Sequence, residues 1–102
     1  MTKPHYTEDR ADYPPEIKFP DLATPAIRRL IVKGQAKHPE DDWDEQDVYH
    51  HVSHAFLHLV DYFFKGIRRD PETGESPLLH ALCRLLMAVH LMERERIECG
   101  GE

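Results

Sequence analysis

Apolar residues recur at intervals of three and four over two long stretches in the second half of the chain, and this spacing predicts two amphipathic helices. The first is expected to begin at a cap on Asp44 or Asp47 and to run to about Gly66. The second opens at Ser76 and Pro77, a capping residue before a proline at the first helical position. The main apolar positions, with the spacing of helix-on-helix packing, are Val48, Val52, Ala55, Phe56, Leu59 and Phe63 in the first helix and Leu78, Leu82, Leu85, Val89 and Met92 in the second. The short connection between them predicts an antiparallel hairpin.

A shorter helix is expected before this hairpin. Thr24 is a suitable N-cap, Pro25 would occupy the first helical position, and Pro39 marks the end. One face of this helix is apolar, and the opposite face is basic, with Arg28, Arg29, Lys33 and Lys37. We expect this face to be solvated, with phosphate binding by part of it as the alternative.

No strand pattern occurs in the chain, so the predicted fold class is all-α. The proline-rich residues 1–20 are expected to form an extended or flexible arm that packs only through Ile17 and Phe19, residues 21–98 the all-α domain, and residues 99–102 a flexible tail. Both hairpin helices carry apolar residues beyond their main positions, which indicates burial on more than one side. We therefore expect a homodimer or higher assembly in which two hairpins form a four-helix core.

Composition narrows the possible functions. The net charge of −6 argues against binding a nucleic-acid polymer through a broad basic surface. The two cysteines, Cys83 and Cys99, form no disulfide framework, and Cys83 is expected in the core. Neither a membrane-spanning run nor the apolar core of a signal peptide is present, so we expect a cytoplasmic protein without a membrane partner.

Polar residues form a stripe along the first hairpin helix. His51, His54, His58, Asp61 and Lys65 share one side of it at 100° per residue. His54 and His58 are four apart, a spacing that lets two imidazoles meet one metal ion. In an antiparallel hairpin, His80 of the second helix lies within about two turns of His58 and Asp61. These three are the residues most expected to form a functional site.

Ordinary structural roles are the alternative for each polar residue. His50 and His51 are expected to be solvated, and His54 suits a rim position as well as ligation. Acids in the turn between the helices are expected to serve first as turn formers; they are Asp70, Glu72 and Glu75. Trp43 suits a hydrophobic clamp better than a base-stacking platform. No cysteine, histidine and acid occur at catalytic spacing, which leaves nucleophilic catalysis without support.

The order of several short motifs resembles a known family. They are Leu22-Ala23-Thr24-Pro25-Ala26-Ile27, Gly34-Gln35-Ala36-Lys37-His38, Asp42-Trp43, His58-Leu59, Asp70-Pro71-Glu72-Thr73-Gly74 and Leu79-His80-Ala81-Leu82-Cys83. Over about residues 17 to 95, the chain resembles the N-terminal domain of phage and bacterial dATP/dGTP diphosphohydrolases, which is related to the MazG-like all-α nucleotide pyrophosphohydrolases.

The resemblance implies that a (deoxy)nucleoside triphosphate is hydrolysed to the monophosphate and pyrophosphate, with Mg²⁺ or Mn²⁺ bound by helix-borne side chains. On matching positions it implies functional roles for His58, Asp70, Glu72 and His80, and places Lys37 and Trp43 near the nucleotide or the dimer seam. Together with the helical spacing, it gives a candidate catalytic pair, His58 and Asp61. The candidate metal ligands are His58, Asp61, Asp70, Glu72 and His80. The paired-glutamate motif E-E-x-x-E of MazG-like enzymes is missing from the chain.

Two other functions remain open on the sequence. One is a non-catalytic module of the same fold that senses nucleotides or binds a protein. The other is a pH-responsive or transition-metal-binding helical dimer, suggested by eight histidines in 102 residues.

Overall fold

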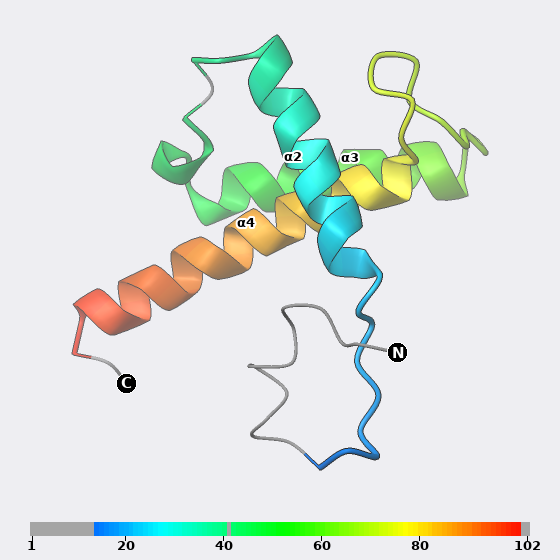
Figure 1. Ribbon diagram of the computed structural model, residues 1–102. Helices are drawn as coiled ribbons and strands as arrows, with labels where there is room; N and C mark the ends of the chain where they lie inside the picture. Colours follow the sequence, from blue (N-terminus) through cyan, green and yellow to red (C-terminus); the bar gives the residue numbers. More distant parts are fainter. Residues whose placement is uncertain (1–13, 41, 101–102) are drawn as a thin grey trace.

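The computed structural model describes residues 14–40 and 42–100, and within them it contains helices and no strands. The elements are α2 (Ala23–Lys37), the short 3₁₀ helix η1 (Trp43–Glu45), α3 (Val48–Phe63) and α4 (Pro77–Glu98). Helices α3 and α4 run antiparallel, and α2 crosses α4 (Figure 1). The predicted all-α fold with an antiparallel hairpin is therefore confirmed.

Two of the predicted helix starts are confirmed. The Ser76 hydroxyl accepts a hydrogen bond from the Leu78 amide at 3.0 Å, and Pro77 is the first residue of α4. The Asp47 carboxylate accepts one from the His50 amide at 2.8 Å and caps α3. In both cases a side-chain oxygen satisfies an amide that has no partner within the helix.

The predicted start of α2 is wrong by a short distance. The helix begins at Ala23 rather than after Thr24, and its preceding residue, Leu22, makes no side-chain cap. A turn in which the Ala23 amide donates to the Pro20 carbonyl at 3.0 Å leads directly into the helix, so a side-chain cap is not needed there. Most of the predicted arm and the end of the predicted tail lie outside the described residues. Of the arm's two expected packing residues, Ile17 is 39% exposed and Phe19 is 36% exposed.

The face that α3 turns toward α4 differs from the predicted one. His51 and Ala55 are the buried residues of α3, whereas Phe56 and Phe63 are 62% and 76% exposed. On α4 the buried side chains include Ala81, Ala88 and Leu91. The main apolar positions predicted to pack within the hairpin are mostly on its outside: Val52, Phe56, Leu59, Phe63, Leu78, Leu82, Leu85, Val89 and Met92. When a helix carries apolar residues on two sides, their spacing does not show which side packs against the neighbouring helix. In this hairpin, the side of α3 that packs against α4 is the one whose histidine forms hydrogen bonds.

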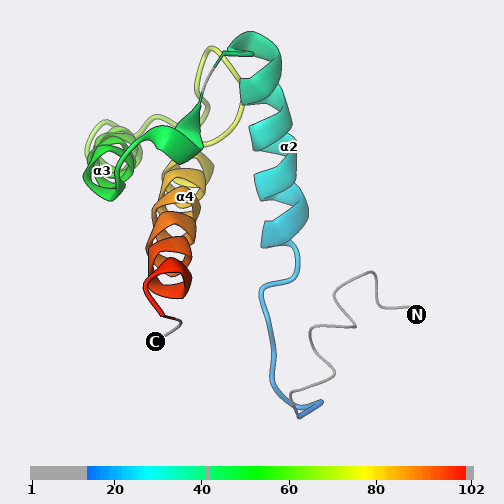
Figure 2. The same cartoon turned by 90° about the vertical axis from the view of Figure 1, so that its left-hand side faces the viewer.

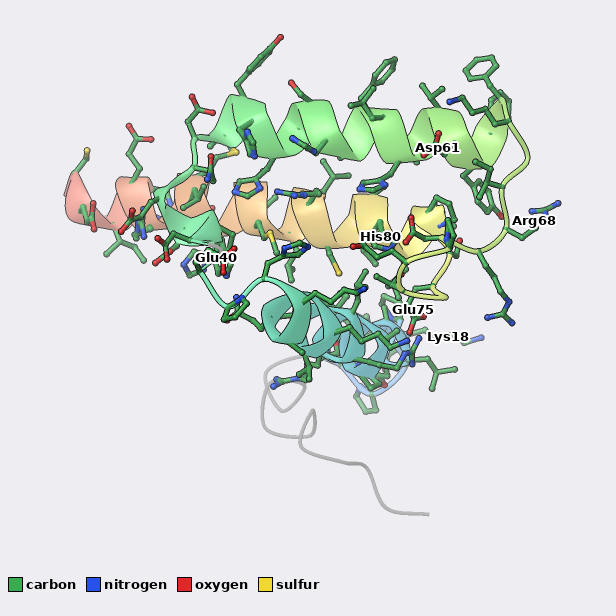
Figure 3. The ribbon with its side chains drawn as sticks, turned by 90° about the horizontal axis from the view of Figure 1, so that it is seen from above. Lys18, Glu40, Asp61, Arg68, Glu75 and His80 are labelled. Atoms are coloured by element: carbon green, nitrogen blue, oxygen red, sulfur yellow. The ribbon has the colours of Figure 1, made fainter. Side chains whose placement is uncertain are left out.

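The basic face of α2 is bound to the turn before α4 and is not simply solvated. Arg29 donates to both carboxylate oxygens of Glu75, from Nε at 2.7 Å and from Nη2 at 2.9 Å. Lys33 Nζ donates to Glu75 at 2.7 Å and to the Thr73 carbonyl at 3.0 Å. Glu75 is therefore more than the turn former that the sequence predicted, and Figure 3 shows it beside α2.

These bonds change the acidity of Glu75. The hydrogen bonds from Arg29 and Lys33 lower the pKa of the Glu75 carboxyl to about 2. Its ionised form thus holds the crossing helix α2 against the turn before α4. Figure 2 shows the position of α2 beside the hairpin from the side. No helix in the described part of the chain combines the length and the apolar character needed to cross a membrane.

We expect Glu75→Gln to lower the melting temperature at pH 7 more than Glu72→Gln does. Glu72 makes a longer and more exposed ion pair, with Lys37 at 3.7 Å. Because the folded-state pKa of Glu75 is below its unfolded value of about 4.3, its contribution is complete above that pH and is lost as pH falls toward 2. The difference between the two variants should therefore narrow below about pH 4. Thermal unfolding followed by circular dichroism measures it, and equal melting temperatures at pH 7 would contradict this role for Glu75.

Candidate functional site

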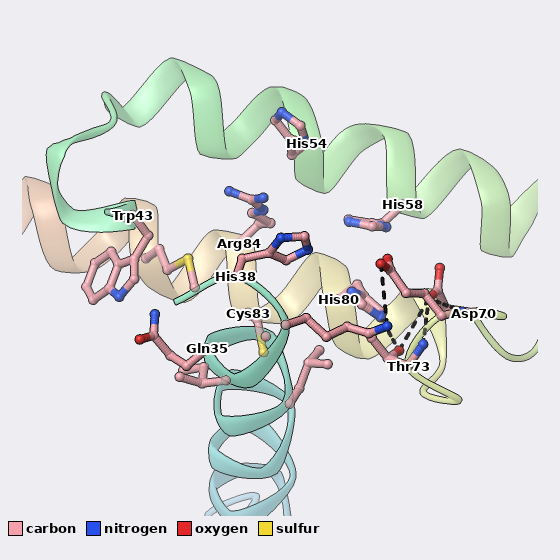
Figure 4. Close-up of a pocket in the computed structure, with 16 residues that line it drawn as sticks. Gln35, His38, Trp43, His54, His58, Asp70, Thr73, His80, Cys83 and Arg84 are labelled. Carbon is pink, nitrogen blue, oxygen red and sulfur yellow. Dashed lines mark hydrogen bonds and ion pairs between the residues drawn. The ribbon is translucent and has the colours of Figure 1, made fainter. Parts of the chain in front are cut away.

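A cavity of about 310 Å³ lies where α2 crosses the hairpin. Its walls are the C-terminal half of α2, η1, one side of α3, the turn before α4, and α4 itself (Figure 4). Both α2 and η1 pack on α4, and the cavity lies between these elements and α3. Side chains from five separate segments therefore converge on one volume, which is the usual form of a ligand site.

Most of the residues predicted for a functional site line this cavity. They are Lys37, Trp43, His58, Asp70, Glu72 and His80. His54 lines it as well, so it lies at the site rather than apart from it. Asp61 does not line the cavity; its carboxylate lies 3.4 Å from the ammonium group of Lys65, which follows the end of α3.

His58 and His80 form the contact between α3 and α4 at the site. Their rings stack with centroids 4.8 Å apart and planes at 30°. Burial lowers the pKa of both imidazoles. For His58, the charges of His80 and Arg84 lower the pKa further, and Asp61 and Asp70 partly oppose the shift. For His80, Arg84 lowers the pKa further, and Asp70, Glu75 and Glu72 partly oppose the shift. Both rings are consequently favoured in the neutral form near pH 7 and can accept protons.

The turn before α4 places one carboxylate and one hydroxyl beside His80. Asp70 Oδ2 accepts hydrogen bonds from the amides of Glu72 and Thr73 at 2.9 and 3.0 Å. The Thr73 hydroxyl lies 2.8 Å from His80 Nε2 and 3.4 Å from Asp70 Oδ2. Burial by itself would raise the pKa of Asp70, but the hydrogen bonds from Thr73 and Glu72 and the nearby His80 hold it below its usual value. The predicted turn role of Asp70 thus coexists with a position at the cavity.

His51 is the clearest correction to the sequence-based prediction. It was expected to be solvated, yet its side chain is fully buried at 0% exposure. Its Nε2 lies 2.8 Å from the Trp43 carbonyl oxygen, and its Nδ1 lies 3.0 Å from Arg84 Nη1. A polar ring with a partner on each nitrogen is compatible with complete burial, and those partners lie too far from His51 along the chain to be predicted from local spacing.

Several cavity residues were not predicted at all. Arg84 and Thr73 contribute polar groups, and Gln35 and His38 come from the end of α2. Arg84 follows His80 by four residues, so the same helical spacing that selected His54 and His58 would have selected it. Gln35, His38 and Thr73 stand in the short motifs that carry the family resemblance, but their place at the cavity depends on how α2 and the turn meet the hairpin.

Cys83 has the core position that was predicted, and Trp43 contributes an aromatic ring to the cavity wall. Cys83 is in the core, and burial raises the pKa of its thiol to about 11, which keeps it protonated and removes it as a nucleophile. Trp43 is half-buried in the cavity wall, where its ring meets His90 edge-on with centroids 5.3 Å apart.

The described residues do not by themselves form a complete metal cage. Among residues 14–40 and 42–100, no three histidine, cysteine, aspartate or glutamate side chains are grouped so that they could hold an ion. Mg²⁺, however, is often bound by one or two carboxylates together with substrate phosphates and water. Asp70 and Glu72 are the two carboxylates of the cavity and fit that partial role.

A family model for the dATP/dGTP diphosphohydrolase N-terminal domain matches residues 4–98 of the chain. The chain belongs to this family. Comparison with curated proteins and with solved structures finds no significant match. The suspected family is thus confirmed, and its name connects the domain with hydrolysis of purine deoxynucleoside triphosphates.

We expect the free energy of unfolding to fall as pH falls from 8 to 5.5. The folded-state pKa values of His54, His58 and His80 are lowered, chiefly by burial, whereas the unfolded chain titrates near pH 6.5. Below that pH the unfolded chain binds protons that the folded chain does not, so folding is disfavoured. Urea unfolding at the two pH values measures the decrease, which should be smaller in the double variant His58→Gln, His80→Gln. An equal decrease in that variant would refute the assignment to these rings.

Proposed function

We propose that the cavity binds a deoxynucleoside triphosphate and that the domain hydrolyses it to the monophosphate and pyrophosphate. The observation that carries this proposal is the convergence, in one cavity, of an indole, two basic side chains and two carboxylates. They are Trp43, Lys37, Arg84, Asp70 and Glu72. The family name supports a nucleotide substrate, and makes dATP and dGTP the first to test.

The two ends of the cavity differ in the chemistry they offer. Trp43 and Gln35 lie toward one end, and His58, His80 and Asp70 lie toward the other (Figure 4). An aromatic ring can stack on a base, and Lys and Arg side chains attract phosphates. In this proposal the base occupies the Trp43 end, and the phosphates lie along Arg84 and Lys37 toward the histidines.

Asp70 and Glu72 would hold the expected Mg²⁺ or Mn²⁺ together with the phosphates. Such an ion supplies positive charge that neutralises the phosphate oxygens. Among the predicted metal ligands, His58 and His80 suit a proton-transfer role better, because Mg²⁺ prefers oxygen ligands.

His58 is the proposed proton acceptor for the attacking water. Its lowered pKa keeps the ring neutral near pH 7, so it can receive a proton. Asp61, three residues later, favours the protonated ring through its negative charge. Asp61 thereby assists His58 without lining the cavity. His80 stacks on His58 and is held by Thr73, which restricts where the His58 ring can lie.

A non-catalytic nucleotide sensor is the second candidate. It is favoured by the lack of a three-ligand metal group among the described residues. A sensor would bind the same nucleotide through Trp43, Lys37 and Arg84 but would not turn it over. Binding and turnover must therefore be measured separately.

We expect pyrophosphate release from dATP or dGTP in the presence of Mg²⁺ or Mn²⁺. His58→Ala should lower kcat by about 10²–10⁴-fold, as for loss of a general base, and Asp61→Ala by less. His50→Ala is the matched control, since His50 is on the same helix and does not line the cavity. Binding is followed separately through the fluorescence of Trp43, the single tryptophan of the chain. Fluorescence changes without pyrophosphate release would favour the sensor, and turnover unaffected by His58→Ala would place the chemistry elsewhere.

We further propose that the protein is a homodimer formed through the outer face of the hairpin. Helical periodicity places the exposed apolar residues of α3 and α4 largely on one side of the hairpin. Four of them, Leu59, Leu78, Leu82 and Leu85, line an apolar hollow together with Ala23, Ala26 and Arg29 of α2. Large exposed apolar patches are rare on monomers and mark interaction surfaces. A second hairpin packed there would complete a four-helix core.

The dimer predicts a mass close to twice 11.9 kDa in light scattering. Phe56→Glu, which adds a charge where the side chain is 62% exposed in the single chain, should shift the protein to the monomer. Val32→Glu is the control, because Val32 is 68% exposed on α2. A monomeric wild-type protein would overturn the assembly.

A further inference from the structure

We propose that the buried imidazole of His51 positions Arg84 as an anion-binding residue of the cavity. The inference deepens the proposed nucleotide binding and rests on it for the identity of the ligand. His51 itself does not line the cavity; Arg84 and Trp43, its two partners, do. His51 is thus a positioning residue that acts through its neighbours.

The hydrogen bonds fix the protonation of the His51 ring. A guanidinium group has only donors, so Arg84 Nη1, at 3.0 Å, must donate to His51 Nδ1. The other nitrogen, Nε2, then carries the proton and donates it to the Trp43 carbonyl at 2.8 Å. The neutral Nε2–H tautomer is the form that satisfies both contacts.

These two bonds connect three elements around one buried ring. Arg84 is on α4, His51 on α3, and Trp43 begins η1. The Trp43 ring also lies 6.3 Å from the His51 ring, centroid to centroid, in an edge-on arrangement. The position of the Arg84 guanidinium is therefore linked, through His51, to that of Trp43 in the cavity wall.

The position of Arg84 suits a phosphate group. It lines the same cavity as His54, His58 and His80, and its charge lowers the pKa of each of these imidazoles. A cation that acts on all three rings lies near the middle of the proposed phosphate path. Arginine has a long side chain with many rotamers, and its planar fork binds phosphate in a defined orientation only when it is held in place. The acceptor on His51, at 3.0 Å, is one such restraint on Arg84.

A purely structural role for His51 makes different predictions, and two substitutions separate them. The Asn side-chain oxygen is as many bonds from Cα as Nδ1 is, so His51→Asn can retain the acceptor for Arg84. The Gln side-chain nitrogen is as many bonds from Cα as Nε2 is, so His51→Gln can retain the donor to Trp43 but lacks the acceptor at Nδ1. A structural role would be impaired by both changes, whereas the positioning role is impaired chiefly by Gln.

Calorimetric titration of the full chain tests the proposal with three probes: inorganic tripolyphosphate, dATP and deoxyadenosine. We expect His51→Gln to weaken tripolyphosphate and dATP binding by about tenfold, as for the loss of one charge-assisted hydrogen bond. His51→Asn should restore most of this affinity, Arg84→Met should match or exceed the loss in His51→Gln, and deoxyadenosine binding should be unchanged in all variants. His50→Gln is the control and should bind all three probes as wild type does.

The outcomes distinguish this inference from the proposed function. Turnover of dATP with unchanged tripolyphosphate affinity in His51→Gln overturns the role of His51 and leaves the hydrolase intact. Tripolyphosphate binding that depends on Arg84 and His51, with no nucleotide turnover, supports the inference and removes the hydrolase. Equal losses in Asn and Gln, loss of deoxyadenosine affinity, or no binding of any phosphate by the wild type overturns it.

A measurement on the unaltered protein keeps the proposal testable if the variants do not fold. Long-range ¹⁵N–¹H spectra should show His51 protonated at Nε2 and unprotonated at Nδ1. The Arg84 side-chain resonances should shift on addition of tripolyphosphate. A protonated Nδ1, or Arg84 resonances that do not respond, would disprove the arrangement.

Discussion

The cavity depends on how α2 is held across the hairpin, and one carboxylate provides the anchor. Glu75 follows the turn from α3 and precedes the cap of α4, and it binds both Arg29 and Lys33 of α2. Lys33 also binds the turn carbonyl of Thr73, the residue whose hydroxyl meets His80. The same few residues therefore fix the crossing helix and shape one end of the site. Anchoring through charges suits this place, because α2 buries only one residue, Leu30, to below a tenth of its surface.

The histidines connect packing with function. Polar rings are buried at low cost only when both nitrogens find partners, and His51 meets this condition with Arg84 and Trp43. His58 and His80 stack at the contact between α3 and α4, where burial keeps them uncharged and open to proton uptake. An interface built from titratable rings costs stability at low pH, and it leaves proton acceptors beside a cavity lined by two cationic side chains and two carboxylates.

The inner and outer faces of the hairpin differ in residue type. The inner face is narrow and partly polar, made of small residues such as Ala55 and Ala81 together with the histidines. The outer face has the bulky apolar side chains that a small domain would ordinarily use as its own core. In the proposed dimer the second chain covers that face and supplies apolar burial. The inner face can then carry the polar side chains that line the cavity.

The sequence by itself determined the helices, the hairpin and the family. The caps at Asp47 and Ser76 and the apolar spacing are local signals, and the short motifs around His58, Asp70 and His80 led to the correct family. Only the tertiary structure decided which face of each helix turned inward, because both sides of α3 and α4 carry apolar residues and the periodicity fits either. It buried His51, paired Arg29 and Lys33 with Glu75, and brought Arg84, Thr73 and Gln35 to the cavity. These placements follow from contacts between residues distant in sequence, whose hydrogen bonds and charges no local pattern records.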